Sequence, residues 1–258
     1  MECQLQWLTE DEGEIVFVEQ KKEWLCVQFF VISEEEAELK LRRLKIVDTT
    51  DEIVNISPEI ISKVTECILE AFRLLWEEGY EETILVERKG SFFSKILDST
   101  GVVRNVYSEY MMCREISQTQ YIVQNSEYWN NIGTIQHRPN HLLSNITEEE
   151  DGLVCENKEG TFFCRLLPYE SKGDDVQSFY LYEVEVDEAV RNQGIATDCL
   201  KELFVTLSKE AAGNPNAARK QVKILLQVGS YNEPAVHLYE KLGFEIYEEL
   251  CCYVPEEA

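Results

Sequence analysis

The chain has 258 residues, of which 49 are Asp or Glu and 24 are Lys or Arg, so its formal net charge is −25 at pH 7. This acidic excess argues against nucleic acids and anionic membrane surfaces as partners, because both favour a basic protein surface. Hydrophobic residues make up 44% of the chain, enough for a real core, and the length allows one large or two modest domains.

The N-terminal residues and the cysteines suggest where the protein resides. The first residues, MECQLQWLTEDEGE, contain neither the basic segment nor the apolar segment of a signal peptide, and no apolar run reaches the length of a membrane span. The nine Cys include no C-x-x-C pair, and only three His are present, so we expect no metal site. These features predict a cytoplasmic protein with reduced thiols.

In chain order, the first half predicts a β-hairpin, a third strand, a helix, a fourth strand, a short helix and a last strand. The segments that carry these elements are 14–31, 41–53, 67–72 and 83–113. Ser57 and Pro58 have the composition of a helix start, with Ser as N-cap and Pro as the first helical residue. Gly101 fits the position after a helix end, where a positive φ is required.

The second half repeats this order of elements. Its segments are 152–169, 179–190, 199–204 and 223–253, with Gly243 in the place of Gly101. Such self-similarity indicates one architecture present twice, with a repeat far longer than in solenoid proteins. We expect a domain boundary between residues 117 and 118, giving domains 1–117 and 118–258. Residues 121–147 are predicted to add a helix and a loop, and the acidic run 147–151 to form a solvated turn.

Hairpins followed by alternating strands and helices predict a mixed sheet with helices on its faces. The fold class is therefore α/β (α+β), in two tandem domains.

A glycine-containing turn connects a strand to a helix in the second half. Arg191 lies before Gly194, Ala196 and Thr197, at the predicted helix start. A helix start carries unpaired N–H groups and partial positive charge, so it can bind an anion where side-chain bulk is small. Arg191 would add a cation and Thr197 a hydroxyl. The turn can therefore hold a pyrophosphate.

Together with a second motif, this turn resembles the GNAT superfamily of acyl-CoA-dependent N-acyltransferases. The first motif is R-x-x-G-x-A, and the second, N-x-P-A-x-x-L-Y-x-K-x-G-F, runs from Asn232 to Phe244. A strand over 222–228 separates the two motifs. The resemblance covers 152–253 well, whereas the first half shares only the order of elements and carries degenerate forms of the motifs. It implies tandem GNAT-like domains, each a mixed, mostly antiparallel twisted sheet flanked by helices.

The resemblance also implies a binding site for acetyl-CoA as cosubstrate. The strand residues Val184, Glu185 and Val186 would pair with the pantetheine arm, and Asn232 would lie near it. The pyrophosphate would be held by Arg191, Asn192, Gln193, Gly194, Ile195, Ala196 and Thr197. Tyr239 would lie near the thioester sulfur and protonate the departing thiolate, or stabilise its charge.

The general base is left open by the sequence. Some family members carry a Glu on the later strand, where this chain has Gln227, which cannot take a proton. Glu183 and Glu185 are the candidates on the earlier strand, and strand alternation places them on one face, opposite Val184 and Val186. A water chain could also serve.

The first half lacks these motifs. Asp51–Lys63 contains neither Gly nor Arg in the place of the turn, and Leu97 stands where the second half has Tyr239. We therefore expect no acyl-CoA site there. The first domain would act as a packing partner or would supply one wall of the acceptor cleft.

The expected function is acetyl transfer to a primary amine by direct attack in a ternary complex. The acidic composition favours a small cationic amine over a protein amine. A non-catalytic acyl-CoA-binding sensor is the alternative, motivated by Gln227. A purely structural protein is disfavoured by the intact turn at 191–197. Either a monomer or a homodimer is compatible with a tandem chain.

Overall fold

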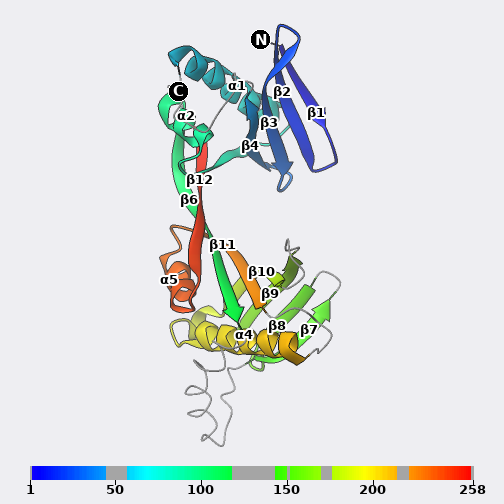
Figure 1. Ribbon diagram of the computed structural model, residues 1–258, viewed down its shortest axis with the longest axis vertical. Coiled ribbons are helices and arrows are strands. Elements are labelled where there is room, and N and C mark those ends of the chain that lie inside the picture. The colour runs from blue at the N-terminus through cyan, green and yellow to red at the C-terminus, as the bar shows by residue number, and fades with distance from the viewer. Residues whose placement is uncertain are drawn as a thin grey trace, which may run out of the picture. The chain divides into compact units, whose positions relative to one another are not determined.

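The computed structural model describes residues 2–44, 57–117, 143–149, 152–169, 176–213 and 221–256 (Figure 1). The chain forms two compact units, which are described separately. The first consists of Met1–Glu109, Gly229–Tyr231 and Glu248–Ala258, and the second of Tyr110–Val228 and Asn232–Tyr247. The helix and loop predicted within 121–147 fall largely on 118–142, outside the described residues.

The first unit combines a sheet with two helices. Its elements are β1 (Glu2–Trp7), β2 (Glu12–Glu19), β3 (Lys22–Val31), β4 (Glu36–Leu44), α1 (Pro58–Glu77), β5 (Glu82–Arg88) and α2 (Phe92–Thr100). Neighbouring strands from β1 to β4 pair antiparallel, and β4 pairs parallel to β5. A parallel pair needs a crossover connection, and α1 lies in that connection.

Helix α1 buries one apolar face in the core of the first unit. Ser57 accepts a hydrogen bond from the N–H of Ile60, and Pro58 stands at the first helical position, as the sequence predicts. Apolar residues then recur at helical spacing, so that one face of the helix is apolar. The buried face consists of Val64, Cys67, Ile68, Ala71, Phe72 and Leu75.

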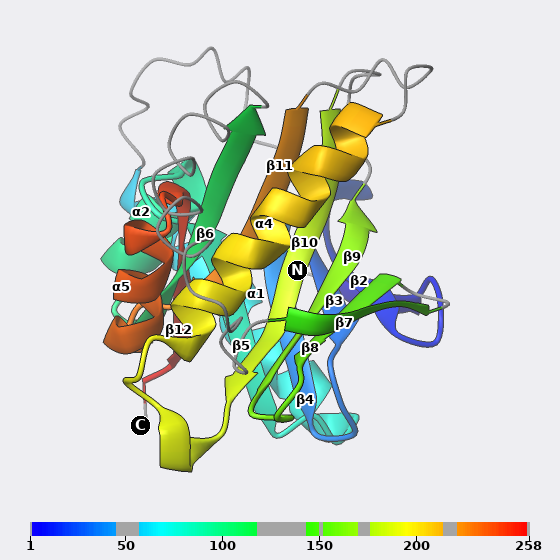
Figure 2. The same cartoon turned by 90° about the horizontal axis from the view of Figure 1, so that it is seen from below.

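The second unit repeats this arrangement. Its elements are β7 (Leu143–Glu149), β8 (Gly152–Asn157), β9 (Phe162–Tyr169), β10 (Val176–Val186), the short 3₁₀ helix η1 (Glu188–Val190), α4 (Ile195–Gly213), β11 (Gln221–Gly229) and α5 (Glu233–Lys241). Strands β7 to β10 pair antiparallel along the series, and β10 pairs parallel to β11. Figure 2 shows α4 lying across the sheet. Its residues Cys199, Leu200, Leu203 and Phe204 are fully buried in the core of this unit.

The predicted fold class is confirmed, with one additional strand at the start of each repeat. These strands, β1 and β7, precede the predicted hairpins and pair antiparallel with β2 and β8. The acidic run that we expected to be a turn is therefore partly strand, because β7 extends to Glu149. Gly101 and Gly243 have φ of 68° and 82°, as a helix end requires.

Each unit includes a strand from the other half of the chain. The long strands β6 (Val103–Ser117) and β12 (Glu245–Pro255) each end one half. In the first unit, β12 pairs antiparallel with β5, from Leu250↔Arg88 to Tyr253↔Leu85. In the second unit, β6 is the neighbour of β11 (Figure 1). The compact units therefore do not coincide with a single cut between residues 117 and 118.

Two further features concern the oxidation state of the cysteines and the hydrophobicity of the helices. All nine Cys lie among the described residues and are free thiols. None of the described helices combines the length and the apolar character needed to cross a membrane.

Candidate functional site

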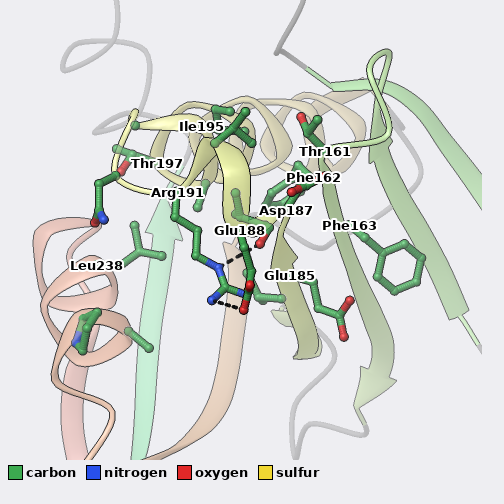
Figure 3. A pocket seen from close by; sticks show the side chains of 18 of the residues that line it. Thr161, Phe162, Phe163, Glu185, Asp187, Glu188, Arg191, Ile195, Thr197 and Leu238 are labelled. Carbon is green, nitrogen blue, oxygen red and sulfur yellow. Dashed lines mark hydrogen bonds and ion pairs between the residues drawn. The ribbon is translucent and has the colours of Figure 1, made fainter.

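A cavity of about 940 Å³ opens in the second unit where β10 leads into α4 (Figure 3). It brings together most of the residues that the sequence nominates. Those that line it are Val184, Glu185, Val186, Arg191, Asn192, Gly194, Ile195, Ala196, Thr197, Asn232 and Tyr239. Glu183 and Gln193 are not among the lining residues.

The sequence assigned no role to the other lining residues, although Pro234, Ala235 and Leu238 belong to the motif at 232–244. These other lining residues are Gly160, Thr161, Phe162, Phe163, Asp187, Glu188, Val190, Pro234, Ala235 and Leu238. Asp187, Glu188 and Val190 lie between the nominated segments, so closeness in sequence could have indicated them. Gly160 and Thr161 come from the turn between β8 and β9, and Phe162 and Phe163 begin β9. Only the pairing of β9 with β10 brings these four residues to the cavity.

The cavity lies beside a point where two parallel strands stop pairing. Within the described residues, the pairing of β10 with β11 ends at Tyr180↔Leu225, although β10 continues to Val186 and β11 to Gly229. On its other edge, β10 stays paired with β9 as far as Val186↔Phe162. One edge of β10 is thus left for another hydrogen-bonding partner, and an extended ligand could take that place.

The turn between β10 and α4 combines a capped 3₁₀ helix with two left-handed residues. Asp187 caps η1, its Oδ1 accepting the N–H of Ala189 at 2.9 Å. Asn192 and Gly194 have φ of 62° and 84°. A Cβ added to Gly194 would meet no heavy atom within 4 Å, so the requirement for Gly is the positive φ. The open space beside it leaves the first N–H groups of α4 accessible.

Arg191 contacts its own turn. Its Nε donates to the carbonyl oxygen of Val186 at 3.0 Å, and its Nη1 lies 3.2 Å from Oε1 of Glu188. The Arg191 side chain is 57% exposed and that of Glu188 85% exposed. The guanidinium therefore lies at the cavity in a solvent-screened ion pair.

Tyr239 forms part of the cavity wall from α5. Asn232 is the N-cap of this helix, its side chain accepting the N–H of Ala235. The Tyr239 ring is buried and packs edge-on against Phe244, with ring centroids 5.7 Å apart. Burial, and to a lesser degree the nearby Cys164 thiol, raises the pKa of Tyr239 to about 12. At neutral pH its phenol is protonated and can donate a hydrogen bond.

The two candidate bases have different surroundings. Glu185 is exposed and lines the cavity, whereas Glu183 lies 2.9 Å from Nε of Arg165 in an ion pair. Regular alternation does not hold between them, because the β9–β10 register shifts between Tyr182 and Glu185 and Glu183 has a φ of 50°. This bulge explains why Glu185 lines the cavity and Glu183, two residues before it, does not.

The equivalent place in the first unit is filled by a side chain. Pairing of β4 with β5 ends at Leu39↔Leu85, within the described residues. Beyond it, the buried Glu87 accepts the N–H of Leu41 at 3.2 Å, and its other carboxyl oxygen accepts from Ser91 at 3.3 Å. Burial raises the pKa of Glu87 to about 7. This carboxyl group therefore occupies the gap that a ligand would need.

Metal-ligand clusters of three or more His, Cys, Asp or Glu are not found among the described residues. The lining of the cavity is chemically suited to an extended ligand bearing phosphate groups. Its features are an unpaired strand edge, an accessible helix start and one guanidinium.

A sequence model of the "Acetyltransferase (GNAT) domain" family matches residues 148–246. No curated protein matches the chain.

Solved structures share the fold at low sequence identity. The GCN5-related N-acetyltransferase from Sphaerobacter thermophilus is 12% identical, with a TM-score of 0.52, covering 96% of this chain and 81% of that one. A GCN5-related glucosamine N-acetyltransferase region of a fungal multi-domain β-N-acetylglucosaminidase is also 12% identical, with a TM-score of 0.51, covering 96% of this chain and 33% of that one. A tandem GNAT protein of the clavulanic acid pathway gives 9% identity and a TM-score of 0.48, covering 96% of this chain and 83% of that one. Residues 148–246 therefore match the model of the acetyltransferase (GNAT) domain, and the fold of the chain is that of solved GNAT proteins.

Proposed function

We propose that this protein is an acetyl-CoA-dependent N-acetyltransferase whose active site is the cavity at the end of β10. The observation that carries the proposal is the position of this cavity. It joins the unpaired edge of β10, the glycine turn before α4 and the protonated Tyr239 in one space of about 940 Å³. These are the three parts that the resemblance assigns to an acyl-CoA site.

The donor would bind along the second unit only. The backbone of Val184–Val186 would pair with the pantetheine arm, and Asn232 would lie near it. The helix start and the turn 191–197 would hold the pyrophosphate, with room provided by Gly194. The donor supplies the acyl thioester, and the chain supplies its orientation.

Tyr239 would act as a hydrogen-bond donor to the leaving sulfur. Its pKa of about 12 lies well above the value of about 8.5 for an ordinary thiol, so complete transfer of its proton to a thiolate is uphill. A neutral phenol in a buried position still stabilises developing negative charge. We therefore favour charge stabilisation over full protonation at this residue.

Glu185 is the better placed of the two candidate bases. It is exposed and lines the cavity, whereas the ion pair with Arg165 holds Glu183 elsewhere. Glu185 would accept a proton from the incoming amine directly or through water. A backbone N–H on the unpaired edge of β10 would donate to the oxyanion.

The acceptor is proposed to be a primary amine, with a small cationic molecule favoured over a protein amine. The net charge of −25 would attract a cationic substrate. Glu185, Asp187 and Glu188 bring carboxylates to the cavity itself. The first unit would contribute no donor site, because Glu87 fills its strand gap. A cytoplasmic monomer or homodimer without a metal cofactor remains our proposal for the assembly.

Calorimetric titration with acetyl-CoA tests the donor site. Wild-type protein should bind one acetyl-CoA per chain, and Gly194→Trp should abolish binding, because an indole would occupy the space before α4. Gly90→Trp is the matched control, since Gly90 also has a positive φ and open surroundings but lies in the first unit. Absence of binding by the wild-type protein would refute the proposal.

A non-catalytic acyl-CoA sensor is the second candidate, because the exposed Gln227 stands where some family members carry a Glu that can act as general base. A panel of amines with a thiol-release readout separates the two functions. Release above background that decreases in Tyr239→Phe identifies the enzyme. Tight binding without release for any amine identifies the sensor.

A further inference from the structure

The charged residues at the cavity are mostly of the wrong sign for a phosphate ligand. Among the described lining residues, the carboxylates are Glu185, Asp187 and Glu188, and the one cation is Arg191. A pyrophosphate brings further negative charge into this space. The availability of Arg191 should therefore have a large effect on how tightly such a ligand binds.

Arg191 is already engaged by two groups of its own turn (Figure 3). Its Nη1 lies 3.2 Å from Oε1 of Glu188, and its Nε lies 3.0 Å from the carbonyl oxygen of Val186. Asp187 is directed elsewhere, since its Oδ1 accepts the N–H of Ala189. Glu188 is thus the carboxylate that holds the guanidinium.

The local backbone produces this pair. Glu188 begins the 3₁₀ helix η1, and Arg191 follows as its C-cap. Side chains three residues apart eclipse in a 3₁₀ helix, so Glu188 and Arg191 extend from the same side of the turn. Both side chains are more than half exposed, so water screens the attraction between them, and the backbone of the turn keeps them close together.

We propose that Glu188 is an internal counter-ion that competes with the pyrophosphate of the donor for Arg191 and so lowers donor affinity. This inference rests on the proposed function. To contact Arg191, a pyrophosphate must displace the Glu188 carboxylate from the guanidinium, and it is then repelled by the negative charge of that nearby carboxylate. A ligand with only the pantetheine arm does neither. Glu188 therefore determines how strongly the phosphate part of the donor contributes to binding.

The test compares affinities of CoA and pantetheine for variants, by calorimetry. Glu188→Gln should tighten CoA binding about two- to five-fold, the range expected when one exposed ion pair is lost. Pantetheine affinity should not change. The gain for CoA should shrink as salt is raised, because the charges are exposed.

Two further variants separate the counter-ion from a general charge effect. Glu148→Gln changes the net charge equally at an exposed position of β7 that does not line the cavity, and should leave CoA affinity unchanged. In an Arg191→Gln background, Glu188→Gln should no longer tighten CoA binding.

Three results would overturn the inference. If wild-type protein binds CoA but Glu188→Gln binds it equally or more weakly, the ion pair is only a structural part of the turn. If the gain persists without Arg191, or appears with pantetheine, it does not arise from competition for the guanidinium. If wild-type protein binds no CoA, the proposed function and this inference are both wrong.

Discussion

Tyr239 shows how burial sets the chemistry of a single side chain. Its ring is enclosed by Phe244 and the core of the second unit, so its phenol loses hydration and its pKa rises to about 12. The residue consequently keeps its proton throughout the physiological range. It can donate a hydrogen bond at every pH at which the protein would work.

Removal of the Tyr239 hydroxyl should reduce turnover without changing the pH profile. We expect Tyr239→Phe to lower kcat about 10- to 100-fold, because one hydrogen bond to the leaving sulfur is lost, and to leave KM nearly unchanged. Steady-state kinetics between about pH 6 and pH 9 check this, with Tyr169→Phe at an exposed position as control. If the substitution removes a basic limb of the profile, Tyr239 titrates in that range and acts as a true acid.

The sequence could nominate individual site residues only where a local motif exists. The turn at 191–197 and the motif containing Asn232 and Tyr239 are readable because spacing and residue type are set within one segment. Thr161 and Phe163 carry no such signal, since they reach the cavity only through the pairing of β9 with β10. The bulge at Glu183 was also hidden, because alternation is the default assumption for any strand.

At the scale of elements, the corresponding parallel strand pairs of the two units, β4 with β5 and β10 with β11, differ in what occupies the gap beyond their last paired residues. Beside β10 the gap opens into the cavity, while beside β4 the carboxyl group of Glu87 fills it. Burial raises the pKa of Glu87 to about 7, from about 4.3 in an unfolded chain. The folded protein therefore binds this proton more tightly. The contribution of protonated Glu87 to the free energy of unfolding is complete below about pH 4.5 and is lost as pH rises through about 7.

Glu87→Gln should make the first unit more stable at alkaline pH. The neutral amide avoids a buried charge, so we expect the free energy of unfolding to increase by about 1–3 kcal/mol at pH 8 and to change little at pH 5. Urea unfolding followed by Trp fluorescence at both pH values measures this, since Trp7, Trp24 and Trp76 lie in the first unit. Glu82→Gln, exposed on the same strand, is the control. Equal stabilisation at both pH values would contradict the assigned pKa.

Edge strands explain what the sequence missed at this scale. β1 (ECQLQW) does alternate polar and apolar residues, and its Cys3 and Leu5 pack against the core, so a readable signal for this strand was overlooked. β7 (LSNITEE) lacks such an alternation, and most of its residues are exposed. The hairpins and the helices α1, α4 and α5 were predictable because their apolar periodicity and caps are local. Pairing at an edge is decided by the backbone of the neighbouring strand, which composition does not report.

At the scale of the whole molecule, the two halves of the chain do not fold as two separate stretches. The last strand of the second half, β12, contributes Cys251 and Tyr253 to the core of the first unit. The last strand of the first half, β6, contributes Met112 and Ile116 to the core of the second. A cut after residue 117 would therefore remove a core strand from each unit.

Reciprocal core substitutions test this exchange of strands. Tyr253 is 1% exposed, and its hydroxyl lies 2.9 Å from Asp98, so Tyr253→Ala should destabilise by about 3–5 kcal/mol the unit into which it packs. Amide hydrogen exchange should then show faster exchange in β2–β5 with β8–β11 still protected. Met112→Ala should do the reverse, because Met112 is fully buried in the core of the second unit.

Donor binding gives an independent readout of the same substitutions. Every residue that lines the cavity belongs to the second unit, so Tyr253→Ala should retain acetyl-CoA binding and Met112→Ala should weaken it. Tyr253→Phe, which removes only the hydrogen bond to Asp98, should cost about 1 kcal/mol and serves as the mild control. If Tyr253→Ala instead releases β8–β11, the C-terminal strand supports the unit of its own half, and the exchange is wrong.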